Sequence, residues 1–182
     1  MSAAANPALP EAVRALAEAD FGAVAQRFSE AGFTVGLPAP GIITVKHAAQ
    51  DRQRPAVLVS VGVHGDETGP IEVVAHVLDA LSHAPSELAV DLMVCVGNVD
   101  AIAAGKRFID ADLNRMFRTE RGSLASAFEA ARADTLIAAT CAFFEGAGRS
   151  AGTSTCTRRS VPRTIRCSRS CPRSFPMRRA RR

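Results

Sequence analysis

The sequence predicts an α/β protein with a doubly wound β-sheet, and three consecutive segments carry this prediction. Residues 56–63 (AVLVSVGV) form a continuous apolar, β-branched run, which is typical of a strand buried on both faces. Gly69 and Pro70 then open a helical segment (IEVVAHVLDAL), because proline is favoured in a first helical turn. Residues 92–96 form the next apolar strand. This order of strand, helix and strand implies a right-handed crossover between parallel strands.

Three further elements flank this unit. Residues 10–31 carry apolar side chains at three- and four-residue steps, which predicts helical packing against a core up to Gly32. Residues 42–45 predict a short strand. A second long helix is expected over residues 123–144, where alanine is dense. Its inward-facing side chains are predicted to be Leu124, Phe128, Leu136, Ile137 and Phe143.

The charge distribution divides the chain into two parts. A length of 182 residues with 47% hydrophobic content suits one globular unit. Residues 149–182 hold 11 Arg and no acid, which leaves 11 Lys and Arg against 18 Asp and Glu in residues 1–148, a net charge of −7. We therefore expect residues 1–148 to form the N-terminal part of a catalytic domain, and residues 149–182 to be a disordered basic tail.

The cysteines, the N-terminal residues and the apolar runs predict the cellular compartment of the protein. The five cysteines lack the paired spacing of structural zinc sites, and the N-terminus lacks a basic start followed by an apolar core. Both features favour the cytoplasm. No apolar run approaches the roughly 20 residues needed to span a bilayer, so we expect no membrane contact. The sequence sets no oligomeric state.

His64 and Glu67 form a candidate metal half-site. They stand in the segment GVHGDETGP, directly after the predicted buried strand, where ligands gather in open α/β sheets. An imidazole and a carboxylate three residues apart can bind one cation where glycines let the backbone turn. Catalytic zinc takes three protein ligands and leaves one position open, so this pair needs a third. The alternative is a solvated histidine and glutamate on a polar loop.

A second polar cluster follows the next strand, in Gly97-Asn98 and in RFIDADLNRMF. Arg107, Asn114 and Arg115 supply donors suited to carboxylates, as a substrate with anionic ends would require. Ordinary surface arginines are the alternative. These segments and GVHGDETGPIE resemble the two signature blocks of the succinylglutamate desuccinylase/aspartoacylase family, which is related to zinc carboxypeptidases. The similarity covers residues 33–144.

The resemblance implies an incomplete mixed sheet of the zinc-carboxypeptidase kind. It implies one Zn²⁺ per subunit in the complete site, with His64 and Glu67 as ligands. Arg107, Asn114 and Arg115 would hold substrate carboxylates, and Asp112 would support the site. The implied reaction is hydrolysis of N-succinylglutamate to succinate and glutamate in arginine degradation, with a small acylamino acid as the partner. Aspartoacylase-type and carboxypeptidase-type hydrolysis are the alternatives, together with a non-catalytic fragment.

The family's third ligand and its general base have no counterpart in this chain. The family places the third ligand in a motif resembling His-Leu-Asp-Leu-His-Thr-Ala and a catalytic glutamate further on, but residues 149–182 contain no His, Asp or Glu. The remaining histidines precede the second block. We expect His76 to be a partly buried helix residue, and His47 and His83 to be exposed loop residues.

A shift of reading frame explains both the missing motif and the basic tail. Residues 152–161 (GTSTCTRRSV) can be encoded by GGC ACC TCG ACC TGC ACA CGG CGA TCC GTN. Read two bases later, the same string encodes His-Leu-Asp-Leu-His-Thr-Ala-Ile-Arg, which is the expected motif. We therefore interpret the residues from about 149 onward as out of frame. The alternative is a basic nucleic-acid-binding arm, but its arginines lack interleaved stacking aromatics, so we expect no nucleic-acid partner.

Overall fold

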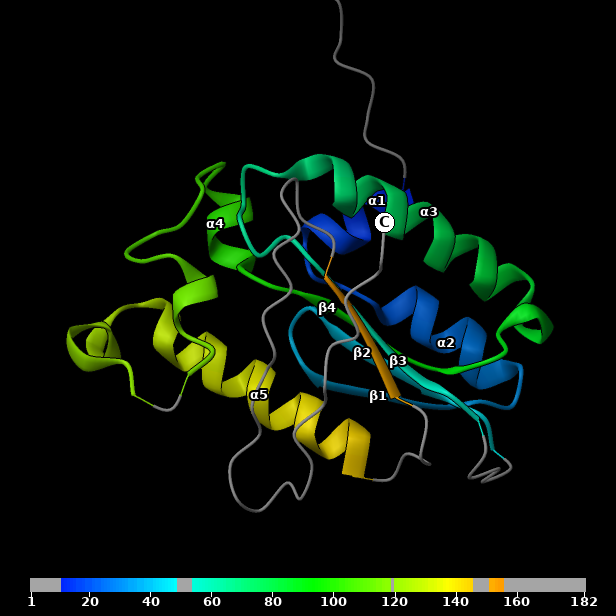
Figure 1. Cartoon of the computed structure of the whole chain (residues 1–182). Coiled ribbons are helices and arrows are strands. Elements are labelled where there is room, and N and C mark those ends of the chain that lie inside the picture. Colours follow the sequence, from blue (N-terminus) through cyan, green and yellow to red (C-terminus); the bar gives the residue numbers. More distant parts are fainter. Residues whose placement is uncertain (1–10, 49–53, 119, 146–150, 156–182) are drawn as a thin grey trace, which may run out of the picture.

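A mixed β-sheet forms the middle layer of the computed structural model (Figure 1). The structure describes residues 11–48, 54–118, 120–145 and 151–155. Within these ranges the sheet has five strands in the order β1-β2-β4-β3-β5. β2 pairs antiparallel with β1 and β4, whereas β3 pairs parallel with β4 and β5. The strands are β1 (Thr34–Ala39), β2 (Ile42–Lys46), β3 (Ala56–Val61), β4 (Asp91–Val96) and β5 (Ala151–Thr155).

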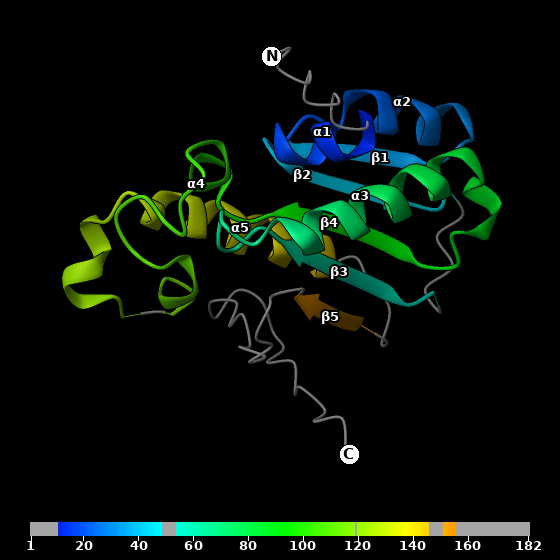
Figure 2. The same ribbon diagram turned by 90° about the horizontal axis from the view of Figure 1, so that it is seen from above.

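Helices cover both faces of the sheet (Figures 1 and 2). One face carries α1 (Glu11–Ala17), α2 (Gly22–Glu30) and α3 (Thr68–His83). The other face carries α5 (Glu129–Glu145), and the short α4 (Val99–Ala103) follows β4. The predicted doubly wound α/β fold is thus confirmed, with α3 as the crossover between parallel β3 and β4. Among the described residues, no helix is long and apolar enough to cross a membrane.

Alternating side chains on the central strands build two cores. On β4, Leu92, Val94 and Val96 pack with α1, α2 and α3, whereas Met93 and Cys95 pack with α5. On β3, Val61 belongs to the first core and Leu58 to the second. Both predicted strands are therefore buried on two faces, because helices cover each side of the sheet.

The predicted helical segment over residues 10–31 is two helices. Ala19 adopts a φ of 58°, which ends α1, and the Asp20 side chain accepts a hydrogen bond from the N–H of Gly22, the first residue of α2, at 2.9 Å. The turn lets both helices bury their apolar faces, with Leu16 and Phe28 almost fully buried. Periodicity alone does not reveal this turn, because apolar residues continue at helical spacing across it.

β1 has no counterpart in the predicted elements. Gly36 and Pro38 are unusual inside a strand, but β1 is an edge strand, where proline costs no ladder hydrogen bond on its open side. The register with β2 shifts between Gly36 and Ala39, which accommodates the proline in an irregular stretch.

β5 lies inside the segment that the sequence predicts to be disordered. Ala151–Thr155 pair with β3 from Ala56 to Ser60, so for these five residues the prediction needs correction. Backbone pairing requires N–H and C=O groups rather than apolar side chains, and hydropathy therefore gives no indication of it. The remaining residues from 149 onward lie outside the described ranges.

Packing of Phe28 provides a test of the first core. Phe28 on α2 is fully buried, so Phe28→Ala should lower the free energy of unfolding by about 3–5 kcal/mol. Phe128, 56% exposed, is the matched control, and Phe128→Ala should change it by about 0.5 kcal/mol or less. Urea denaturation measures both changes. Equal losses for the two variants would contradict the described core.

Candidate metal and substrate site

The candidate site lies in the turn between the end of β3 at Val61 and the start of α3 at Thr68. Gly62 has a φ of 62°, a conformation that favours glycine, and it turns the chain after Val61. Gly65 packs against α4 so closely that a Cβ there would overlap the backbone of Ala101 and Ile102. Two glycines therefore shape the turn that presents His64 and Glu67.

The His64 ring is the centre of the site. Its side chain is buried, and Nδ1 lies 3.1 Å from Oε1 of Glu67. On the opposite side of the ring, Nε2 lies 3.2 Å from Oδ1 of Asp112. The imidazole thus bridges two carboxylates, that of Glu67 three residues along the chain and that of Asp112 48 residues along the chain.

The loop of residues 107–115 brings the predicted substrate-binding side chains to the same ring. Nη2 of Arg107 lies 3.2 Å and Nδ2 of Asn114 lies 3.3 Å from Nε2 of His64. Arg107 also faces Glu67 at 3.8 Å, and Arg115 lies 4.0 Å from Asp112. The structure therefore gathers all five predicted site residues, together with the supporting Asp112.

The spacing of the half-site suits a shared cation. Two ligands at tetrahedral zinc lie about 3.4 Å apart, given metal–ligand distances near 2.1 Å. The separation of 3.1 Å between Nδ1 of His64 and Oε1 of Glu67 is close to this value. Asp112 cannot complete the set, because it contacts the other ring nitrogen. In the part of the chain that the structure describes, no group of three or more His, Cys, Asp or Glu side chains could hold a metal ion.

Exposure differs between the two halves of the site. The side chains of His64 and Glu67 are 7% and 12% exposed, whereas those of Arg107 and Arg115 are 49% and 58% exposed. The metal half-site is buried, and the guanidinium groups reach solvent. An anionic ligand arriving from solvent would meet the arginines first.

Glu129, the first residue of α5, holds the loop and was not predicted as a site residue. Its carboxylate is buried and accepts backbone N–H groups from Ile109 at 2.7 Å and Ala111 at 3.0 Å. Asp110 donates to both oxygens at 3.2 and 3.3 Å, and the Asn98 side chain donates at 3.3 Å. Burial alone would raise the pKa of Glu129, but these hydrogen bonds outweigh it and lower the pKa.

Glu129 also corrects the predicted inward face of the second long helix. Residues 122–126 form a 3₁₀ helix, and α5 begins only at Glu129. Leu136 and Phe143 are buried as predicted, but Phe128 is 56% exposed and Glu129 takes the inward position. Hydropathy favours phenylalanine at an inward position, so the sequence offers no direct indication of a buried carboxylate there.

The other histidines take no part in the site. His76 on α3 is exposed rather than partly buried as predicted. His47 is partly buried rather than exposed, because its ring packs on Phe33 at 4.7 Å and its backbone N–H donates to Asp91. His83 is exposed, as predicted, but it is the last residue of α3 rather than a loop residue.

Cys95 is not a candidate nucleophile. Burial raises its pKa to about 12, against the opposing effect of the nearby Arg132 charge. A thiol with this pKa stays protonated near neutral pH, so it cannot serve as a thiolate.

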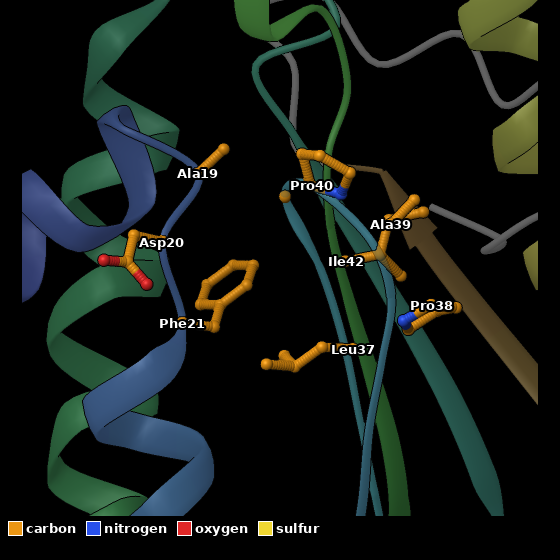
Figure 3. A pocket seen from close by; sticks show the side chains of 9 residues that line it. Ala19, Asp20, Phe21, Leu37, Pro38, Ala39, Pro40 and Ile42 are labelled. Atoms are coloured by element: carbon orange, nitrogen blue, oxygen red, sulfur yellow. The ribbon is translucent and has the colours of Figure 1, made fainter.

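A surface hollow of about 380 Å³ lies apart from these residues (Figure 3). It lies between the α1–α2 turn and the β1–β2 hairpin, with Phe21 and Leu37 among its lining side chains. Asp20 is its ionisable group, and its carboxylate already accepts the Gly22 N–H. The hollow includes none of the predicted site residues, so we do not place the substrate there.

Comparison with known proteins bears on the kind of site. The model of the succinylglutamate desuccinylase/aspartoacylase catalytic domain matches residues 53–151. A succinylglutamate desuccinylase of Burkholderia thailandensis is 43% identical over 112 residues, which cover 62% of this chain and 32% of that protein. The chain therefore spans about a third of the length of this relative.

Solved structures agree with this comparison. The succinylglutamate desuccinylase of Chromobacterium violaceum superposes with a TM-score of 0.56 at 29% identity, covering 71% of this chain and 43% of that chain. The Vibrio cholerae succinylglutamate desuccinylase superposes with a TM-score of 0.62 at 28% identity, covering 68% and 36%.

The close packing of Gly65 generates a test of the site turn. Gly65→Ala forces a Cβ onto the α4 backbone, so it should destabilise the protein by about 1–3 kcal/mol. It should also shift the NMR signals of the His64 ring. Gly69 has no atom within 4 Å of a Cβ position, so Gly69→Ala should change stability by less than about 1 kcal/mol. Equal stability of the two variants would contradict the described turn.

Proposed function

Because this chain belongs to the succinylglutamate desuccinylase/aspartoacylase family, we propose that its site is the N-terminal half of a zinc-dependent amidohydrolase site for N-succinylglutamate. Hydrolysis would release succinate and glutamate, and would serve arginine degradation in the cytoplasm. One observation carries the proposal: the His64 ring faces Glu67 on one side and Asp112, Arg107 and Asn114 on the other. A metal half-site and a set of carboxylate-binding donors thus meet at one side chain.

The donors around Nε2 of His64 suit an anionic substrate. The guanidinium of Arg107 and the amide of Asn114 can both donate to a carboxylate, and Arg115 adds a second positive charge nearby. Succinylglutamate carries several carboxylates, so this concentration of donors favours it over a neutral peptide. In the structure, Arg107 and Asn114 contact the imidazole of His64.

His64 and Glu67 would hold the zinc. When bound, zinc polarises an amide carbonyl and lowers the pKa of water in hydrolases of this kind. If Nδ1 of His64 held the metal, the ring N–H would be on Nε2 and would donate a hydrogen bond to Asp112, which would fix the tautomer and the ring orientation. In that state Arg107 and Asn114 no longer face a free lone pair, so they are available to the substrate.

The third zinc ligand and the general base are absent from the described residues, and we propose that a frameshift near residues 148–150 accounts for this. The family model matches no further than residue 151, which agrees with a change of frame there. β5 supports the proposal further, because it runs parallel to β3 with Thr155 opposite Ser60. In the other frame, the second histidine of the motif is encoded across codons 156 and 157. It would therefore come directly after β5 in the chain.

The 182-residue chain should bind zinc weakly and show negligible hydrolysis of N-succinylglutamate, since two ligands hold zinc less well than three. His64→Ala should weaken the remaining zinc binding by about 10-fold or more, as measured by isothermal titration calorimetry. His76→Ala, on the exposed face of α3, is the matched control and should leave zinc binding unchanged. Stoichiometric zinc with measurable turnover in the 182-residue chain would refute the proposed defect.

Restoring the frame should restore the enzyme. Sequencing codons 140–165 should show a DNA string that encodes His-Leu-Asp-Leu-His in another frame. The frame-restored protein should hydrolyse N-succinylglutamate faster than N-acetylaspartate or a peptide. Arg107→Gln should raise KM for N-succinylglutamate, because it removes a carboxylate donor, whereas Arg118→Gln is the matched arginine control. Codons that cannot yield the motif would exclude the frameshift, and a preference for N-acetylaspartate would exclude the proposed substrate.

A further inference from the structure

The Glu129 carboxylate accepts an unusual concentration of hydrogen bonds for one side chain. Three consecutive backbone N–H groups, those of Ile109, Asp110 and Ala111, converge on its carboxylate within 3.3 Å. Hydrogen bonds to an ionised acceptor are about twice as strong as neutral ones, and this acceptor is 1% exposed. The Glu129 carboxylate therefore anchors the backbone of residues 109–111 to the start of α5.

The anchored residues lie between two groups of the site. Arg107 precedes them and Asp112 follows them, and both contact His64. The loop is also fastened at its start, where the Gly65 N–H donates to the Arg107 carbonyl at 3.2 Å. Near Glu129, the Phe128 N–H donates to the Asp110 side chain at 3.1 Å. The loop thus bridges the His64 turn and the beginning of α5.

α5 is itself fixed to the sheet edge one turn further on. Arg132 donates to the carbonyl oxygens of Val96 at 2.6 Å, Gly97 at 2.8 Å and Pro40 at 2.9 Å. Glu129 and Arg132 are three residues apart, so both lie on the same side of α5. A continuous set of contacts therefore runs from the end of β4, through Arg132 and Glu129, to the loop that carries Arg107 and Asn114.

We propose that Glu129 is a positioning residue that holds the loop of residues 107–115, so that Arg107, Asp112 and Asn114 are preset around His64. This inference rests on the proposed function for the role of those three side chains. The function of the anchor is to limit loop motion before an anionic ligand arrives, which lowers the entropy lost on binding. An anchor that acts through the backbone leaves the side chains of Arg107 and Asn114 free to donate to a ligand.

The charge of Glu129 matters as much as its shape. In Glu129→Gln, one acceptor oxygen becomes an NH₂ donor that faces backbone N–H donors, so at least one hydrogen bond is lost. The lowered pKa of Glu129 agrees with an ionised anchor. Its stabilising contribution is present above the unfolded-state pKa and is lost as the pH falls through the lower folded-state pKa.

Hydrogen exchange of the 182-residue chain tests the anchor directly. In Glu129→Gln, the amides of Ile109, Asp110 and Ala111 should exchange about 10- to 100-fold faster, while amides in the β3–β4 core stay protected. Glu145→Gln, at the exposed end of α5, is the matched control and should change none of these rates. Glu129→Asp keeps the charge with a shorter reach and should give intermediate rates, which also keeps the test decisive if the glutamine variant does not fold.

The affinity for succinate distinguishes a positioning role of Glu129 from a purely structural one, because a purely structural role would leave that affinity unchanged. Below the unfolding transition, Glu129→Gln should weaken succinate binding by about 10-fold relative to the wild-type chain, as measured by NMR titration. Unchanged exchange at residues 109–111, or faster exchange spread evenly over the protein, would overturn the inference, as would unchanged succinate affinity. If the wild-type chain does not bind succinate but exchange changes locally, the anchor is supported and the proposed substrate class is refuted.

Discussion

Parallel pairing of β3 with β4 places the residues that follow each strand at one edge of the sheet, and the candidate site depends on this arrangement. Val61 lies opposite Val96, so the turn after β3 and the Gly97–Asn98 segment run side by side. They approach so closely that a Cβ on Gly97 would lie 2.8 Å from Cα of Val63. A larger residue in place of Gly97 would separate the segments that carry His64 and Asn98.

The electrostatic organisation follows from this closeness. His64 contacts two carboxylates through different ring nitrogens. The guanidinium of Arg107, whose side chain is half exposed, offsets part of the negative charge of Glu67. The buried side of the site thus contains the proposed metal-binding groups, and the exposed side contains cationic donors. For a hydrolase of anionic acylamino acids, such a division would let the arginines select the substrate before the metal half-site is reached.

Sequence patterns predicted the crossover unit well because their cause is local. Strands buried on two faces need continuous apolar runs, and a helix between them shows apolar residues at helical spacing. The patterns were less informative at elements defined by distant contacts. β1 and β5 form through backbone pairing with β2 and β3, and the break at Ala19 and Asp20 lets both α1 and α2 pack over the sheet. Apolar spacing also could not predict that Glu129 is buried while Phe128 is exposed.

The sequence by itself determined the fold class and the family, and it supplied the residues proposed for the site. His64, Glu67, Arg107, Asn114 and Arg115 were recognisable because their chemistry and their positions after predicted strands are properties of short segments. Only the tertiary structure decided which of them touch, that Asp112 takes the ring nitrogen opposite Glu67, and that Glu129 holds the loop. The reason is physical: hydrogen bonds between residues tens of positions apart exist only after the strands have aligned their ends, and no local pattern records that alignment.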